Sequence, residues 1–127
     1  MKTLNEKLAL LQSKIETNSP VTIMIIGLGS VGLYLLDYLV GLSDPDLHLV
    51  VVGRNKDKME QDVNIIRTAA AIRGCLRSKI EIEGRCDLED LSSICTVLKK
   101  YEPDFIVNSS RVYAGLKYGS ISWHNLR

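Results

Sequence analysis

Hydrophobic and polar positions alternate along the chain in blocks that predict alternating strands and helices. Short apolar runs predict strands at residues 21–26, 47–52 and 104–108, and the alternation of isoleucine with glutamate predicts a shorter strand with one polar face at 80–83. Between them, apolar residues recur at helical spacing and predict helices at 30–42, at 56–73 and from 87 to just before Pro103. Strands that alternate with helices of this length predict an α/β fold with a doubly wound parallel sheet and right-handed crossovers.

A separate amphipathic helix is predicted at residues 4–16, before the first strand. Its apolar stripe, at spacings of three or four residues, consists of Leu4, Leu8, Leu11 and Ile15. We expect this stripe to pack against the domain that follows. Pro20 ends the segment because proline disfavours helix in the residue before it. The chain therefore divides into an N-terminal helix, residues 1–19, and one domain, residues 20–127.

Three further details of the helices are predicted. The helix at 30–42 is apolar nearly all round, so we expect it to be buried. Gly74 is expected to end the helix at 56–73, since glycine readily adopts the backbone conformation of a helix C-cap. Asp87 can cap the following helix, because an aspartate side chain accepts hydrogen bonds from the free N–H groups of the first turn.

The composition excludes several classes of protein. With 16 Lys+Arg against 15 Asp+Glu the formal charge is +1, whereas a general nucleic-acid binder carries a basic excess. No apolar run approaches the roughly 20 residues of a membrane helix, and the N-terminus lacks the apolar core of a signal peptide. We therefore expect a cytoplasmic protein with neither membrane nor nucleic acid as a partner. The spacing of Cys75, Cys86 and Cys95 predicts reduced, mostly buried thiols and no metal site.

A glycine-rich turn follows the first predicted strand. It reads G-x-G-x-x-G and comprises Gly27, Leu28, Gly29, Ser30, Val31 and Gly32. Between a buried strand and a helix, these glycines permit a tight turn, close approach of a pyrophosphate, and close packing of the helix on the sheet. The free N–H groups of the helix N-terminus favour phosphate there. The motif predicts a dinucleotide site, and the alternative is a tight turn without a ligand.

The end of the second strand indicates which dinucleotide is bound. An NAD site usually has an acidic residue here that binds the ribose hydroxyls, but this chain has Gly53, Arg54 and Asn55. Glycine removes the carboxylate that would repel a 2′-phosphate, and arginine supplies a donor fork suited to phosphate. The pattern favours NADP(H) over NAD(H), with long-range attraction from Lys56 and Lys58. Alternatively, Arg54 is a solvated turn residue.

Polar residues after the third and fourth strands are candidates for the same site. Asp87 follows the third strand, where an acidic side chain can reach the adenine amino group. Ligands of open parallel sheets bind outside the carboxyl ends of the strands. We therefore expect the residues that end the fourth strand to line the second ribose or the nicotinamide side, namely Asn108, Ser109 and Ser110.

Catalytic residues cannot be assigned from the sequence. Tyr113 and Lys117 spell the Y-x-x-x-K pair of short-chain dehydrogenases, but they follow the fourth strand too closely, and Gly115 disfavours a helix there. We interpret 109–119 as a loop over the cofactor site. We expect His48 to have a structural role, and His124 lies near the chain end.

Residues 21–110 resemble the N-terminal Rossmann domain of NAD(P)-dependent dehydrogenases. Saccharopine-dehydrogenase-like reductases share the GxGxVG start, a Gly-Arg pair such as Gly53-Arg54, and an asparagine such as Asn108. Lactate and malate dehydrogenases share the GSVG turn and a stretch similar to residues 55–58, but they have an acidic residue at the position of Gly53. The resemblance implies that the turn glycines bind the pyrophosphate and Arg54 the 2′-phosphate. The catalytic arginine and histidine of lactate dehydrogenases have no secure counterpart here.

These observations predict the NADP(H)-binding part of an oxidoreductase that transfers hydride to or from a small metabolite. We expect an incomplete Rossmann-like domain, because few residues remain after 108 for further strands. The substrate pocket would then lie on missing sequence or on a partner chain, and we do not expect this chain to be active alone. The sequence leaves open whether the chain forms homo-oligomers. The alternatives are a non-catalytic dinucleotide-sensing module, which would signal through the helix at 1–19, and a degenerate domain that only mediates association.

Overall fold

Four parallel strands and four helices make up the part of the chain that the computed structural model describes, residues 2–110. The strands are β1 (Val21–Ile26), β2 (Leu47–Val52), β3 (Lys79–Glu83) and β4 (Phe105–Asn108). The helices are α1 (Leu4–Glu16), α2 (Ser30–Gly41), α3 (Lys56–Arg73) and α4 (Leu91–Tyr101). The sheet has the order β3-β2-β1-β4 and every pair is parallel. The predicted α/β fold with a doubly wound parallel sheet, preceded by a helix, is confirmed.

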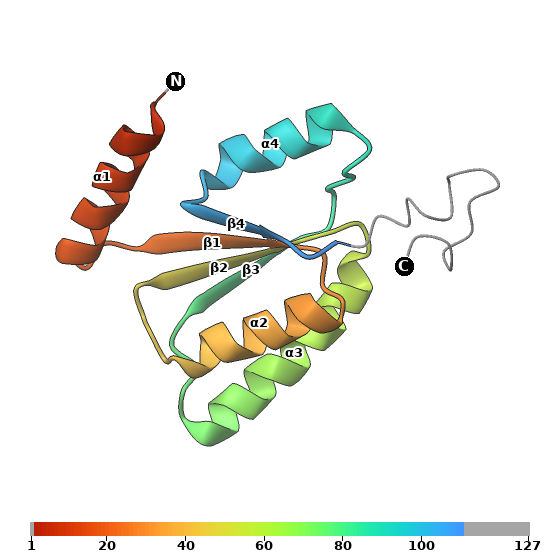
Figure 1. The fold of residues 1–127 in the computed structure, drawn as a ribbon. Helices are drawn as coiled ribbons and strands as arrows, with labels where there is room; N and C mark the ends of the chain where they lie inside the picture. Colours follow the sequence, from red (N-terminus) through yellow and green to blue (C-terminus); the bar gives the residue numbers. More distant parts are fainter. Residues whose placement is uncertain (1, 111–127) are drawn as a thin grey trace, which may run out of the picture.

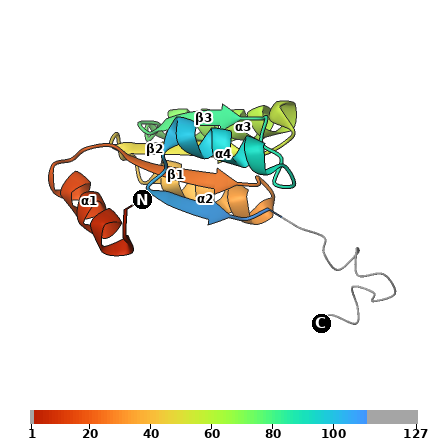
Figure 2. The ribbon, with the colours of Figure 1, turned by 90° about the horizontal axis from the view of Figure 1, so that it is seen from above.

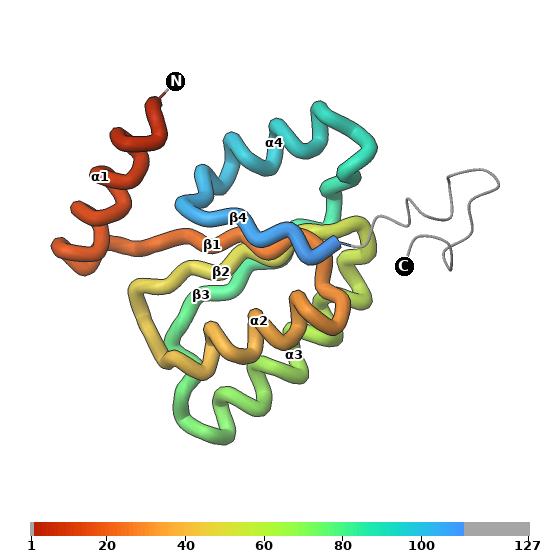
Figure 3. The backbone as a smooth tube through the Cα atoms, viewed as in Figure 1, coloured from red at the N-terminus to blue at the C-terminus, as the bar shows by residue number. Residues whose placement is uncertain are grey.

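The helices cover the sheet from both sides. Helices α2 and α3 lie on one face and α4 lies on the other (Figures 1 and 3). The central strands β1 and β2 are apolar at nearly every position because both of their faces are buried. Alternate residues such as Ile25 and Val51 pack under α2 and α3. Their neighbours Met24 and Val52 pack under α4, together with Cys86 and Val97.

The chain reverses direction across the sheet between β3 and β4. From β1 it passes to β2 and then to β3, after which α4 carries it back to the far side of β1. The carboxyl ends of β1 and β4, at Ile26 and Asn108, therefore flank the point where the strand order reverses. Ligands of doubly wound sheets bind outside the strands at such a point. All four carboxyl ends lie at the same edge of the sheet, on the right in Figure 1.

Side-chain caps fix where most helices begin. Thr3, Asn55 and Asp90 accept hydrogen bonds from backbone N–H groups in the first turns of α1, α3 and α4. The prediction that Asp87 caps α4 is wrong, because that helix begins only at Leu91. The N–H of Asp87 instead donates to the Ser93 hydroxyl at 2.9 Å, which holds residues 87–90 in a turn before the helix.

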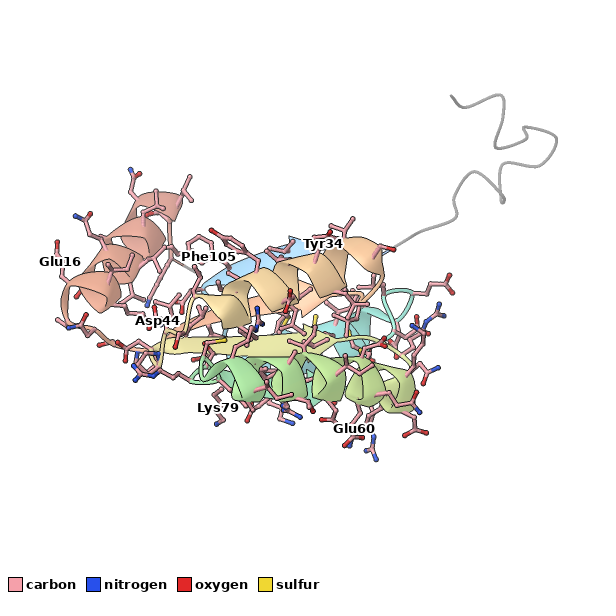
Figure 4. The ribbon with its side chains drawn as sticks, turned by 90° about the horizontal axis from the view of Figure 1, so that it is seen from below. Glu16, Tyr34, Asp44, Glu60, Lys79 and Phe105 are labelled. Atoms are coloured by element: carbon pink, nitrogen blue, oxygen red, sulfur yellow. The ribbon has the colours of Figure 1, made fainter. Side chains whose placement is uncertain are left out.

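Helix α2 is exposed along its outer side, contrary to the prediction that it is buried. Only Gly32, Leu36 and Val40 of this helix are buried. Tyr34 is 83% exposed and lies on the outer side of α2 in Figure 4, and Tyr38 is 66% exposed. The helix is the outermost layer on its face of the sheet, so its outward side chains have nothing above them among residues 2–110.

Helix α1 does not pack its apolar stripe on the domain, contrary to prediction. It has no buried residue, and Leu4 and Ile15 are 71% and 60% exposed. The helix lies beside the sheet at the amino ends of the strands (Figures 1 and 2). An ion pair of 2.8 Å joins Lys14 to Asp104, whose carboxylate also accepts the Thr22 N–H. A polar contact therefore takes the place of the apolar packing that we expected.

Other sequence predictions concern membranes and cysteines. No helix within residues 2–110 is long and apolar enough to cross a membrane. Cys86 is buried, but Cys75 is only partly buried and Cys95 is exposed, so the prediction of mostly buried thiols is wrong. Cys95 falls on the solvent side of α4, which buries only Val97 fully.

Candidate dinucleotide-binding site

The turn between β1 and α2 has no room for side chains at two of its glycines. Gly27 has a φ of +84°, and a Cβ there would lie 2.6 Å from the Cα of Ser110. A Cβ on Gly32 would collide with the carbonyl oxygen of Gly27. The Gly27 N–H donates to the carbonyl of Val52 at 2.8 Å, which fastens the turn to β2. The first and third glycines are therefore required by the backbone itself.

Gly29, the middle glycine, is different because the space at its Cβ position is open. Apart from its chain neighbours, no residue within 2–110 comes within 4 Å of a Cβ built on Gly29, and its backbone is extended, with a φ of −87°. A side chain would fit here without strain, so the fold does not explain the glycine. A ligand that approaches the backbone at this point would explain it.

The N-terminus of α2 has no capping side chain. Gly29 is its N-cap residue, and the first hydrogen bond of the helix runs from the Leu33 N–H to the Gly29 carbonyl. The preceding N–H groups, those of Ser30, Val31 and Gly32, donate to no residue within 2–110. Together with the helix dipole, such groups attract an anion. The turn can therefore bind a phosphate, and Leu28 contributes by anchoring it, since its side chain is buried in the core beneath α2.

The residues that end β4 hold the glycine turn in place. The Ser109 hydroxyl donates to the Gly27 carbonyl at 2.6 Å, and its N–H donates to the Ile26 carbonyl at 2.9 Å. The Asn108 side chain accepts hydrogen bonds from the N–H and hydroxyl of Ser110. The Ser109 side chain therefore lies against the turn, whereas the Asn108 side chain is bonded to Ser110. Their contact with a cofactor stays a prediction.

The residues after β2 occupy the adjoining part of the same edge. Gly53 lies beneath Met59, whose sulfur would be 2.8 Å from a Cβ at position 53. Arg54 is exposed and forms no ion pair within residues 2–110. The side chain of Asn55 caps α3 by accepting the Lys58 N–H at 3.1 Å. Arg54 is therefore the charged member of this group whose side chain remains available to a ligand.

The loop after β3 brings a second Gly-Arg pair to this edge, which the sequence reasoning missed. Gly84-Arg85 follows β3 as Gly53-Arg54 follows β2, and this repetition was the available signal. Both arginines are exposed, and backbone hydrogen bonds join the two segments. Asp87 follows in the same loop, where its carboxylate accepts the Glu89 N–H at 3.0 Å.

An acidic side chain at the end of β3 is bound by two side chains of α4. Lys100 Nζ and the Tyr101 hydroxyl each lie 3.1 Å from Glu83 Oε2. Burial raises the pKa of Glu83, but hydrogen bonds from Lys100 and Tyr101 and the Lys100 charge outweigh it and hold the pKa below its ordinary value. Burial and the hydrogen bond to Glu83 raise the pKa of Tyr101. This carboxylate is therefore held toward α4.

We expect acid to remove the stabilisation that Glu83 supplies. A carboxyl whose pKa is lower in the folded state stabilises the fold above its unfolded pKa, and the contribution disappears as the pH falls through the folded value. Glu83→Gln should therefore unfold more readily than the wild type at neutral pH, and the difference should shrink below the ordinary glutamate pKa of 4.5. Urea unfolding across this pH range measures it, with Glu60→Gln on α3 as the control for losing a surface charge. A difference that stays constant with pH would contradict the prediction.

The comparisons with known proteins identify no relative. No protein-family model matches this chain, and no curated protein matches it. The candidate site is therefore inferred from the sequence and geometry of this chain alone.

The structure places the predicted site residues at one edge of the sheet and His48, which we expected to be structural, away from them. The glycine turn, Arg54 and the end of β4 share the carboxyl edge of the sheet. His48 lies near the opposite end of β2, where it pairs with Glu81 at 3.0 Å. A surface hollow between α2 and α3, lined by Tyr34 and Ile65 among others, contains no predicted site residue. Tyr113, Lys117 and His124 lie outside the described residues, as does most of the predicted loop at 109–119.

Proposed function

We propose that this chain is the NADP(H)-binding part of an oxidoreductase that transfers hydride to or from a small metabolite. The observation that carries the proposal is the uncapped, open N-terminus of α2 at Gly29. It lies where the strand order of the sheet reverses, the usual place for a ligand in such folds. The glycine turn fits a pyrophosphate because its free N–H groups and the open space at Gly29 occur together.

The dinucleotide, when bound, supplies the hydride chemistry. The residues of this chain would position it. The N–H groups at the start of α2 would bind the pyrophosphate, and Arg54 would bind the 2′-phosphate. Ser109 would keep the turn in the binding conformation through its hydrogen bond to the Gly27 carbonyl. We propose that the substrate pocket and the catalytic acid come from another domain or a partner chain.

A second candidate function is a regulatory module that senses a dinucleotide, and α1 is the observation that favours it. This helix carries exposed leucines on a surface that no residue within 2–110 buries. Its Lys14 is paired with Asp104, the residue just before β4, and β4 ends beside the glycine turn. A partner bound to α1 would thus be connected to the site through one strand. Both candidates require dinucleotide binding.

Titration of the purified chain with NADPH and NADH tests the proposal, with fluorescence or calorimetry as the readout. We expect the chain to bind NADPH more tightly than NADH. We also expect Arg54→Ala to weaken NADPH binding by about 10- to 150-fold, the loss of one charge-assisted contact, without changing NADH binding.

Lys58→Ala is the matched control for Arg54→Ala. Lys58 is a neighbouring exposed cation that the sequence predicts to attract the phosphate from a distance, but its ion pair with Asp62 at 3.3 Å offsets that charge. We expect this variant to bind NADPH about as tightly as the wild type. Equal losses for NADPH and NADH on substitution of Arg54 would show that this side chain does not recognise the 2′-phosphate.

A further inference from the structure

Three basic side chains surround the carboxyl ends of β2 and β3. Arg54 follows β2, Lys56 begins α3, and Arg85 lies in the loop after β3. All three are exposed, and none forms an ion pair with another residue in the described part of the chain. They form a basic cluster, and the proposed binding of the 2′-phosphate by Arg54 leaves Lys56 and Arg85 without a function.

Backbone hydrogen bonds hold two of these residues on neighbouring segments. The Gly53 N–H donates to the Glu83 carbonyl at 3.0 Å, which continues the β2–β3 ladder beyond Val52. The next bond runs from the Cys86 N–H to the Gly53 carbonyl at 3.3 Å, one residue later than a regular parallel ladder would place it. An extra residue is thus accommodated at Gly84-Arg85, as in a β-bulge. Neighbouring strands lie about 4.8 Å apart, so both arginine side chains can reach one phosphate group.

Gly84 places the third cation in the same cluster. A Cβ on Gly84 would collide with the Cβ of Lys56, so the first turn of α3 lies directly on the backbone of the β3 loop. This close approach holds Lys56 against the backbone of Gly84, the residue directly before Arg85. A side chain at position 84 would push the two segments apart, and we therefore attribute this glycine to the packing of the cluster.

The acidic groups of this region are engaged by other donors. Glu83 is bound by Lys100 and Tyr101, and its carboxylate also accepts a hydrogen bond from the Arg85 backbone rather than from the Arg85 guanidinium. Asp87 accepts the Glu89 N–H within its own loop, and Asp57 lies in the first turn of α3, where the helix dipole stabilises it. None of these carboxylates forms an ion pair with the three cations. The cluster therefore offers positive charge to an anionic ligand.

We propose that Arg85 is a second specificity-determining residue, which binds the 2′-phosphate of NADP(H) from the side opposite Arg54. This inference rests on the proposed function and extends it. A phosphate monoester carries roughly −1.5 to −2 charge at neutral pH and has three acceptor oxygens, more than one guanidinium fork can satisfy. Two forks on adjoining segments can bind it from two directions. Lys56 adds a point charge at the same place.

The experiment measures how tightly the full chain binds four ligands: NADPH, NADH, 2′,5′-ADP and 5′-AMP. The last two lack the nicotinamide half and differ in the 2′-phosphate. We expect Arg85→Ala to weaken NADPH and 2′,5′-ADP by about 10-fold, the loss of one charge-assisted contact, and to leave NADH and 5′-AMP unchanged. Arg85→Lys keeps the charge and should recover part of the loss. Lys58→Ala is the matched control, and unchanged circular dichroism and thermal unfolding of Arg85→Ala confirm that it folds.

The outcomes separate this inference from the proposed function. If Arg54→Ala binds NADPH more weakly while Arg85→Ala and Lys58→Ala keep the wild-type affinity, the proposed role of Arg85 is wrong. The proposed binding of NADP(H) would then still stand. If Arg85→Ala weakens NADPH and NADH equally, the side chain contacts the adenine rather than the 2′-phosphate, and the inference is overturned. If the wild-type chain binds none of the four ligands, both the proposed function and this inference fail.

Discussion

Gly29→Asp is expected to abolish NADPH binding and yet to stabilise the fold. Aspartate is a preferred N-cap residue, and the extended backbone and open space at Gly29 accept its side chain. Capping and the helix dipole should raise the free energy of unfolding by about 0.5 kcal/mol. The same carboxylate would occupy the proposed pyrophosphate site, where like-charge repulsion of several kcal/mol lowers affinity by roughly 100-fold or more. Urea unfolding and NADPH titration measure the two effects.

Gly29→Asn separates charge from size in this experiment. Asparagine caps a helix about as well as aspartate but carries no charge. We expect a similar gain in stability and a smaller loss of NADPH affinity than for the aspartate variant. A folded Gly29→Asp variant that binds NADPH as tightly as the wild type would show that no phosphate lies at the α2 N-terminus.

Gly27→Ala is expected to destabilise the protein by about 2–4 kcal/mol. Two causes add at this position. Alanine has to adopt a φ of +84°, and its Cβ would lie 2.6 Å from the Cα and 2.7 Å from the N of Ser110, backbone atoms that cannot rotate away. The turn and the end of β4 must therefore separate. Urea unfolding monitored by circular dichroism measures the loss.

Gly74→Ala is the matched control because it isolates the first cause. Gly74 also has a positive φ, +74°, but in the part of the chain that the structure describes only its chain neighbours come within 4 Å of a Cβ built there. Gly74→Ala should destabilise the protein only by the cost of holding alanine at a positive φ, about 1–2 kcal/mol. Equal losses for Gly27→Ala and Gly74→Ala would contradict the contact that we infer between the turn and Ser110.

The sequence predicts the elements of this fold well because strong local signals define them. The apolar runs of β1 and β2 require two covered faces, and Gly74 ends α3 in the left-handed conformation as expected. Predictions failed where distant residues decide the outcome. The apolar outer side of α2 does not reveal whether anything covers Tyr34. Asp87 and Asp90 are equally good caps by type, and in the structure Asp90 caps α4 by accepting the Ser92 N–H, while the Asp87 N–H donates to Ser93.

The candidate site is only partly readable from the sequence. The G-x-G-x-x-G motif and Arg54 follow strands directly, so the sequence already places them at the carboxyl edge of the sheet. The motif alone does not distinguish Gly29 from its neighbours; the open space around its Cβ position does. The repeated Gly-Arg pair was the available signal for Arg85, but its nearness to Gly53 follows from the pairing of β2 with β3. That pairing joins distant segments, and no local pattern encodes it.

The ion pair between Lys14 and Asp104 has a consequence for how the chain unfolds. Helix α1 buries no side chain, so detaching it exposes little apolar surface and loses mainly one partly exposed ion pair. The sheet and its covering helices would remain intact, since their core clusters contain no residue of α1. The protein would then have two levels of stability: a helix that opens by local fluctuation and a core that unfolds only globally. A partner that binds the exposed leucines of α1 would raise the free energy needed to detach the helix toward the free energy of unfolding the core.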